Sequence, residues 1–249
     1  MRLSGPLWLL LAIPGIAVCA VTVAAEVCEV STPMASLNIP RVKKAPDLNT
    51  DPRSATWKHA SEAWIIADCS TKSLDYPKLK TEVRAFYTDT DLYLLFVSPY
   101  TELNLWLPPD PTKDHLKLWD RDVVEFFLGD DWTDIKHYRE FEIAPTGDWV
   151  DLAIDLGKEK YEANWESGWQ RQGRIDEANK VWYAAAKVPL KSVSDHPVKP
   201  GTKWRANLYR IDGLGEDPQR HFMCWQPTCV VNRDPNHVPE HFGTLVFTK

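Results

Sequence analysis

Positive charge and glycine are both scarce in this sequence of 249 residues. It has 29 Lys and Arg against 35 Asp and Glu, a net charge of −6, and only 11 glycines. Nucleic acids and anionic membrane surfaces are bound through basic patches that neutralise phosphates, so we expect neither as a partner. The composition, with 44% hydrophobic residues, also excludes collagen-like, coiled-coil and wholly disordered chains. Tryptophan, by contrast, is abundant at 12 residues.

The common catalytic motifs are missing as well. The sequence has no phosphate loop, no dinucleotide glycine fingerprint, no Gly-x-Ser-x-Gly elbow and no His-Glu-x-x-His pair. We therefore expect a protein that is not an enzyme. A glycoside hydrolase remains an alternative, because such enzymes use two carboxylates across a cleft. Its candidate carboxylates are Asp122, Glu125, Glu140 and Glu142.

The N-terminal segment resembles an export signal. An apolar run from Leu7 to Ile13 continues to the small residues that end at Ala25, where we expect cleavage. A spanning helix is disfavoured because Pro14 interrupts the run, and lipidation at Cys19 is a weaker alternative. The predicted organisation is a signal peptide at 1–25, an N-terminal arm at 26–51 and one domain at 52–249. The mature protein is then secreted, periplasmic or extracellular, and not membrane-bound.

Cleavage leaves four cysteines, an even number in a compartment that permits disulfides. Three pairings are open, and one of them joins Cys224 to Cys229 in a small loop while Cys28 staples the arm to Cys69. Spacing alone does not choose among the three. A zinc site at Cys224 and Cys229 is a poorer interpretation, because no second pair at finger spacing follows.

Period-two segments rich in β-branched and aromatic residues dominate the rest of the chain. Two of them flank the turn 88–91 and form a predicted hairpin. Helices are expected only near 54–63 and directly after Pro189. The absence of helical crossovers predicts an all-β fold, an antiparallel β-sandwich with one or two short helices. The eight expected strands are 81–87, 92–97, 122–128, 138–144, 149–154, 181–188, 204–211 and 244–247.

The tryptophans divide into two groups. Trp149, Trp182 and Trp204 lie within expected strands, where large aromatic rings most often pack in a core. Loops on a rigid scaffold more often carry binding residues, and a flat indole can stack on the apolar face of a sugar ring. The tryptophans in or beside loops are therefore the candidate ligand contacts: Trp106, Trp119, Trp165 and Trp169.

One central segment, Leu118-Trp119-Asp120-Arg121-Asp122-Val123-Val124-Glu125-Phe126-Phe127-Leu128, resembles the most recognisable motif of carbohydrate-binding module family 9-like domains. Further blocks agree in order, so the resemblance spans roughly 39–249. It implies a jelly-roll-like, DOMON-like sandwich that binds an oligosaccharide or polysaccharide without catalysis and takes part in carbohydrate catabolism. The other blocks are 91–96, 138–145, 204–212 and 242–245.

The resemblance also implies particular site residues. Trp119 corresponds to the first of two tryptophans that sandwich the sugar, and Glu125 to a neighbouring acidic ligand. Tyr209 stands where the sugar binders carry an amide, and Glu142 stands where they carry an arginine. The second tryptophan is missing, and His237 is the residue in that region that could offer a flat face.

Relatives in the wider superfamily suggest two cofactors. Some bind b-type haem, for which His221 and Met223 are the candidate ligands in an alternative electron-transfer function. Calcium accompanies the family and would be structural here, although no EF-hand spacing occurs. The available carboxylates are Asp110, Asp114, Asp120, Asp130 and Asp131.

Overall fold

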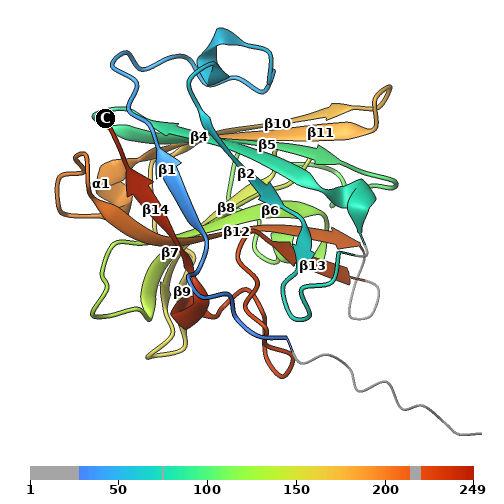
Figure 1. Cartoon of the computed structure of the whole chain (residues 1–249). Coiled ribbons are helices and arrows are strands. Elements are labelled where there is room, and N and C mark those ends of the chain that lie inside the picture. The colour runs from blue at the N-terminus through green and yellow to red at the C-terminus, as the bar shows by residue number, and fades with distance from the viewer. Residues whose placement is uncertain (1–27, 75, 214–219) are drawn as a thin grey trace, which may run out of the picture.

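The computed structural model describes residues 28–74, 76–213 and 220–249, so the predicted signal peptide lies outside the described residues. Two β-sheets pack face to face (Figure 1). The smaller sheet has five strands in the spatial order β10 (Gln170–Asp176), β11 (Val181–Pro189), β5 (Asp91–Pro99), β4 (Thr81–Tyr87) and β2 (Ser61–Ile65).

The larger sheet has nine strands. Its main path is β1 (Ser36–Ile39), β14 (Gly243–Phe247), β12 (Lys203–Gly213), β6 (Val123–Gly129), β7 (His137–Ile143), β8 (Trp149–Asp155) and β9 (Lys160–Glu162). Two further strands extend it, with β13 (Arg220–Cys224) paired to β12 and β3 (Ala67–Asp68) paired to β13. Strands β1 and β14 are parallel, and the other pairs are antiparallel. The all-β sandwich predicted from the sequence is confirmed.

All eight expected strands are present, and the short helix after Pro189 is α1 (Leu190–Val193). The helix expected near 54–63 is wrong: only a 3-10 turn, η1 (Ala55–Trp57), forms there before β2 begins. Strand β1 lies in the segment expected to be an arm. Strand β1 is hard to predict from the sequence because its pairing partner, β14, is remote in the chain.

Alternating side chains divide each sheet into two faces. Val124, Phe126 and Leu128 of β6 point into the main core between the sheets, where Trp149, Trp182 and Trp204 are also buried, as expected. Trp169 is buried there too, so the sequence-based assignment of this residue as a ligand contact is wrong.

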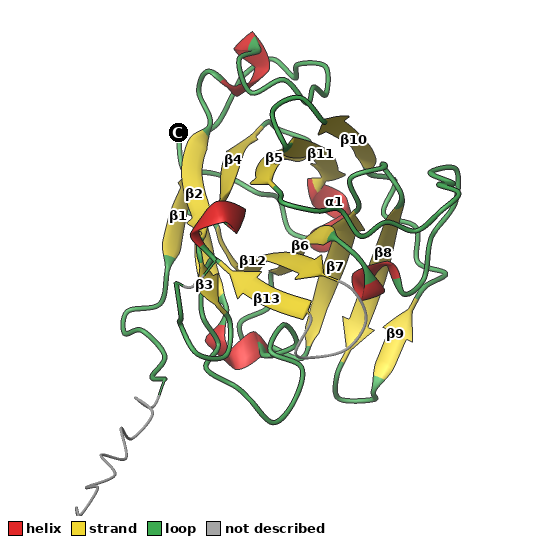
Figure 2. Ribbon diagram, turned by 90° about the vertical axis from the view of Figure 1, so that its right-hand side faces the viewer, coloured by secondary structure: helices red, strands yellow, loops and turns green. Residues whose placement is uncertain are grey.

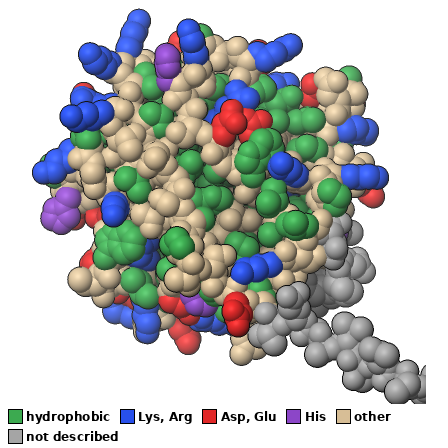
Figure 3. All heavy atoms as spheres, in the orientation of Figure 1, with side chains coloured by type: hydrophobic (Ala, Val, Ile, Leu, Met, Phe, Trp, Pro, Cys, Tyr) green, Lys and Arg blue, Asp and Glu red, His purple; other side chains and the backbone are tan. Residues whose placement is uncertain are grey.

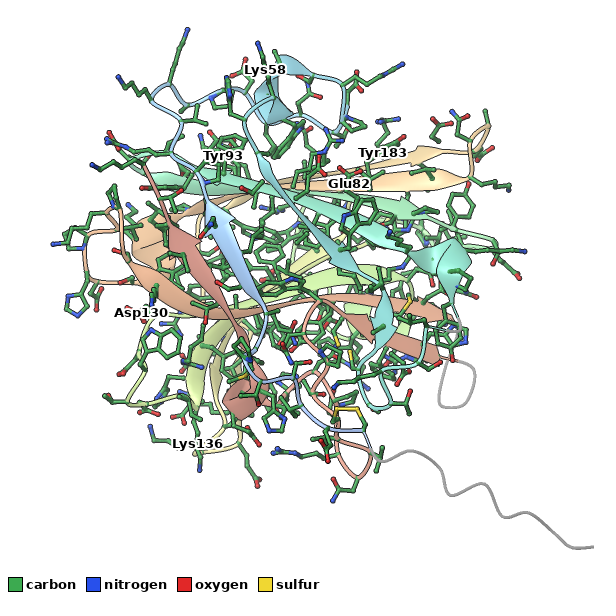
Figure 4. All side chains as sticks on the ribbon, in the orientation of Figure 1. Lys58, Glu82, Tyr93, Asp130, Lys136 and Tyr183 are labelled. Carbon is green, nitrogen blue, oxygen red and sulfur yellow. A yellow bond between two sulfur atoms is a disulfide. The ribbon has the colours of Figure 1, made fainter. Side chains whose placement is uncertain are left out.

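The outer faces of the two sheets are covered differently. A second cluster, which includes Trp57, Phe86 and Tyr93, lies outside the five-stranded sheet. The segment that carries Lys58 covers it (Figure 4). A third cluster, which includes Phe127 and Tyr138, lies on the outer face of the nine-stranded sheet, whose β6, β7 and β8 run side by side (Figure 2). The candidate functional site is on this last face.

A disulfide joins Cys28 to Cys229, whereas Cys69 and Cys224 are buried free thiols. One of the three pairings contains this bridge, but its second bridge, between Cys69 and Cys224, is not formed, and the pairing of Cys224 with Cys229 and of Cys28 with Cys69 is wrong. Cys229 is consequently unable to serve as a zinc ligand.

The surface carries charges of both signs, interspersed with hydrophobic side chains on the face in Figure 3. Among the residues that the structure describes, no helix has both the length and the apolar character needed to cross a membrane.

Candidate functional site

Three glutamates lie next to one another on the outer face of the nine-stranded sheet. Glu125 on β6 is directly opposite Glu142 on β7, and Glu140 is two residues before Glu142 and so points to the same face. Each of the three residues is at most 3% exposed. Like charges at directly opposed strand positions destabilise a sheet, so ionising these carboxyls costs stability.

The three glutamates form the floor of a cavity of about 1330 Å³, which we call the carboxylate cavity. Trp119 lines it from η3 (Leu118–Asp120), the turn that precedes β6, and Tyr161 lines it from the edge strand β9. Trp119 and Glu125, which the sequence selected, are thus in one cavity. The remaining lining includes residues of β13 and of the 233–240 loop.

The site is held together by a loop that is remote in sequence. Asn236 Nδ2 donates a 2.8 Å hydrogen bond to Oε2 of Glu125, and the carbonyl oxygen of Asn236 accepts a 2.7 Å bond from the hydroxyl of Tyr209. Tyr209 is completely buried and is not among the cavity-lining residues. Its position is therefore beneath the site, where it supports the loop that contacts Glu125.

His237 is also fixed by its neighbours. Its Nδ1 is 2.6 Å from the hydroxyl oxygen of Tyr138, and its Nε2 is 3.7 Å from Oε2 of Glu140. The rings of His237 and Tyr161 form a T-shaped contact, with the centroids 5.5 Å apart and the planes at 85°. The His237 side chain is only 18% exposed, whereas Tyr161 is 49% exposed. Tyr161, rather than His237, offers the open aromatic surface at this end of the cavity.

Burial controls the ionisation of the floor. It raises the pKa of Glu125 and Glu142 well above the usual value of a glutamate. Repulsion from Glu140 adds to both increases, and repulsion from Glu125 adds to that of Glu142. The pKa of Glu140 is raised by burial too, while the nearby His237 opposes the increase. Arg220 is the cation that lowers the pKa of both Glu125 and Glu142. The floor consequently retains protons at pH values where exposed glutamates have lost them.

Two features of the floor distinguish its members chemically. Both carboxyl oxygens of Glu142 are shielded from solvent and accept no hydrogen bond from the described residues, whereas its protonated form can donate one to the neighbouring Glu140. Glu125 has one partner, Asn236, and its side chain retains a small exposed area. Glu125 is thus the better placed of the two to accept a hydroxyl hydrogen from a ligand. Glu142 influences the floor indirectly, through its contact with Glu140 and its repulsion from Glu125.

Trp119 is partly buried and packs against the apolar cluster on this face. Arg220 donates a hydrogen bond from Nη2 to the carbonyl oxygen of Trp119 and lies 3.9 Å from Asp120 through Nη1. This pairing ties β13 to η3. The Trp119 backbone is therefore fixed at the cavity wall by a partly buried arginine.

Three residues of the site escaped the sequence analysis: Tyr161, Asn236 and Arg220. Tyr161 is in a three-residue strand without a periodic pattern, and Arg220 contacts residues about 100 positions earlier in the chain. Only Asn236 had a local signal, since it is adjacent to the selected His237.

The other candidate residues are elsewhere. Asp122 is fully buried and accepts hydrogen bonds from the backbone nitrogens of Asn104 and Gly213. Both of its carboxyl oxygens are therefore used to hold the backbone. Met223 is packed in the main core, and His221 is paired with Asp212 at 3.4 Å. Met223 and His221 line neither described cavity and do not fit an open haem site.

The carboxylates considered for calcium do not fit one ion. Asp110 and Asp131 are engaged with the backbone and hydroxyl groups of nearby threonines, and Asp120 is beside Arg220. Within residues 28–74, 76–213 and 220–249, no group of three or more acidic, histidine or cysteine residues is arranged to hold a metal ion.

Comparison with known proteins identifies similar folds only. No protein-family model and no curated protein matches the sequence. A candidate carbohydrate-binding protein from Bacteroides uniformis is similar in structure, with a TM-score of 0.68, 18% identity, and coverage of 86% of this chain and 99% of that one.

Two structures of a family 9 carbohydrate-binding module from Caldicellulosiruptor kristjanssonii are also similar. One is a complex with cellotriose and the other with glucose, each with a TM-score of 0.59 and 12% identity. They cover 86% of this chain and 94% or 96% of the module. The resemblance predicted from the sequence is therefore confirmed for the fold: this chain has the β-sandwich of the family 9 carbohydrate-binding modules.

Proposed function

We propose that this chain is a non-catalytic carbohydrate-binding protein whose site is the carboxylate cavity. The observation that carries the proposal is that Trp119 and Tyr161 line the same cavity as three buried glutamates. Sugars present apolar C–H faces and hydroxyl edges, so an aromatic wall beside hydrogen-bonding groups is complementary to them. The fold shared with modules solved with cellotriose and glucose supports the same function.

Each part of the cavity has a role in this proposal. The sugar ring stacks on the Trp119 indole, and Tyr161 takes the place of the missing second tryptophan. Glu125 accepts a hydroxyl hydrogen, while Asn236 holds that carboxyl in position through its 2.8 Å bond. Glu142 and His237 act indirectly, through the charge of the floor and through the orientation of Tyr161. Tyr209 supports the Asn236 loop.

Secretion and a role in carbohydrate catabolism belong to the same proposal. The Cys28–Cys229 disulfide is typical of an oxidising compartment outside the cytosol, which agrees with the predicted signal peptide. A binding protein in that compartment meets polysaccharides or their fragments.

Glycoside hydrolysis is the second candidate, and one observation favours it. Carboxyl groups of raised pKa in a cavity are typical of the general acid of a glycosidase. Against it, both oxygens of Glu142 are sealed from solvent and Asp122 is outside the cavity. Incubation of the purified protein with labelled cello- and xylo-oligosaccharides separates the two functions. Cleavage that disappears in Glu125→Gln would favour the enzyme.

Titration of tryptophan fluorescence with cellotriose, xylotriose and glucose tests the binding proposal. We expect dissociation constants between micromolar and millimolar, and at least about tenfold weaker binding in Trp119→Ala, equivalent to about 1.4 kcal/mol. Trp64→Ala is the matched control, because Trp64 is 39% exposed on β2 of the other sheet. Equal binding by wild type and Trp119→Ala, or no response to any of these sugars, would refute the assignment.

A further inference from the structure

A second cavity, of about 730 Å³, lies on the opposite face of the β6–β7 region. We call it the indole cavity because Trp132 and Trp165 both line it. Its residues come from the β6–β7 connection, from β7, from the loop before β10 and from α1 with the loop after it. The two cavities share no lining residue. Figure 4 labels Asp130 and Lys136, near the two ends of the connection that carries Trp132.

Trp132 is unusually exposed for a large aromatic residue, at 51%. Its exposure does not result from a loose attachment, because its Nε1 donates a 3.1 Å hydrogen bond to the carbonyl oxygen of Lys203. An indole fixed at one edge and open to solvent is a preformed platform, and it loses little conformational freedom when a ligand stacks on it.

The connection that carries Trp132 is held by one buried arginine. Arg205, 3% exposed, donates from Nε, Nη1 and Nη2 to the carbonyl oxygens of Asp131, Ile135 and His137 at 2.8, 3.2 and 3.2 Å. Gly129 makes room for it, since a β-carbon there would be 2.5 Å from Nη2 of Arg205. A buried arginine thus fixes this surface loop.

The second indole is fixed but less open, because Trp165 is half-buried and packs edge-on against Phe141 with the ring centroids 5.9 Å apart. The guanidinium of Arg139 lies 4.8 Å from the ring centre of Trp165, and its Nε donates a 3.3 Å bond to the carbonyl oxygen of Ser192. Arg139 thereby links β7, the Trp165 loop and α1. The acidic Glu166 and Asp195 and the basic Lys191 line the same cavity.

The geometry points to a second carbohydrate-binding site in the indole cavity. Two fixed indoles supply apolar stacking surfaces, and carboxylate, ammonium and hydroxyl groups around them can accept and donate hydrogen bonds to sugar hydroxyls. A peptide recognised by strand addition needs a free strand edge. Arg139 is the one lining residue that belongs to a strand, and β7 is already paired with β6 and β8. The site rests on its own residues and does not depend on the Trp119 site.

Indole Nε1–H resonances in a two-dimensional NMR spectrum provide the test, with cellotriose, xylotriose and chitotriose as probes. In Trp119→Ala protein, we expect at least one probe to shift the Trp132 and Trp165 signals with saturation. Trp132→Ala should weaken that binding at least tenfold, Trp132→Phe should retain part of it, and Trp64→Ala should leave it unchanged. The dispersion of the other indole signals reports that each variant is folded.

The outcomes separate this site from the carboxylate cavity. The same titrations of the wild-type protein read both sites at once: shifts at Trp132 without shifts at Trp119 would support the indole cavity and refute the proposed function of the carboxylate cavity. If no probe shifts the Trp132 signal, or if a probe still shifts the Trp165 signal of Trp132→Ala with unchanged affinity, the second site does not exist.

Discussion

Asn236 donates a 2.8 Å hydrogen bond from Nδ2 to Oε2 of Glu125, across 111 positions of sequence. Both side chains are almost completely buried. The bond brings the 233–240 loop onto β6 and gives one carboxyl of a crowded acidic floor a specific partner. The stability of the fold and the shape of the candidate sugar site therefore depend on the same contact.

Removing this contact should destabilise the protein. We expect Asn236→Ala to reduce the free energy of unfolding by about 1–3 kcal/mol, because it leaves a buried carboxyl oxygen without its donor. Urea unfolding followed by far-UV circular dichroism measures the change. Asn38→Ala, at an exposed position of edge strand β1, is the control. An unchanged midpoint in Asn236→Ala would show that the bond contributes nothing.

The acidic floor should make the protein less stable as the pH rises. The pKa values of Glu125, Glu140 and Glu142 are raised by burial, so the folded state binds more protons than the unfolded state, whose glutamates titrate near 4.5. Their contribution is fully present below that pH and is lost upwards towards the folded pKa values. Each extra proton costs about 1.4 kcal/mol per pH unit in this window. Arg220, Asp234 and His237 also face the floor and modify the profile.

The measurement is the melting temperature between pH 4 and 8 for wild type and Glu142→Gln. The amide cannot ionise, so we expect this variant to be more stable than wild type at neutral pH and to depend less on pH. Glu62→Gln, at an exposed position of β2, should retain the wild-type profile. Parallel profiles for wild type and Glu142→Gln would mean that Glu142 does not hold a proton in the folded state.

The cysteines should differ sharply in reactivity. Cys69 and Cys224 are buried, and burial raises the pKa of the Cys69 thiol further from the reactive range. We expect a thiol reagent to modify neither cysteine in native protein and both after unfolding, as counted by mass spectrometry of non-reduced protein. Rapid labelling of the native state would contradict the buried positions.

The disulfide should contribute to stability. It links residues 201 positions apart, and replacing Cys28 and Cys229 by serine should cost about 2–5 kcal/mol, chiefly by releasing the unfolded chain. Guanidinium unfolding of this double variant measures the loss. Cys69→Ala, which breaks no bridge, controls for the removal of a cysteine. A double variant as stable as wild type would rule out this contribution.

The β6–β7 connection should lose its rigidity in Gly129→Ala. A β-carbon at this position would contact Arg205, which holds three carbonyl groups of that connection. We expect faster amide hydrogen exchange over 130–137 and a lower melting temperature. Gly168→Ala has open space around it but a positive φ, so it controls for a strained glycine elsewhere. Exchange rates like those of wild type would show that Arg205 does not control the connection.

The amino-acid sequence by itself determined the sandwich. Alternation along segments such as 81–87 and 138–144 is a local property, and it produced eight correct strands because each has one face in the core. The motif around Trp119 and Glu125 also selected two residues of one cavity. They are close in the chain, with Trp119 in the turn η3 and Glu125 in the strand β6 that follows it.

The tertiary structure alone decided the rest. The cavity is completed by Tyr161 from β9, Asn236 from the 233–240 loop and Arg220 from β13. No local sequence pattern predicts contacts between segments so far apart in the chain. The pairing of Cys28 with Cys229 depends in the same way on which chain segments meet in space. Burial, which raises the pKa of the three glutamates, is likewise a property of packing and not of residue type.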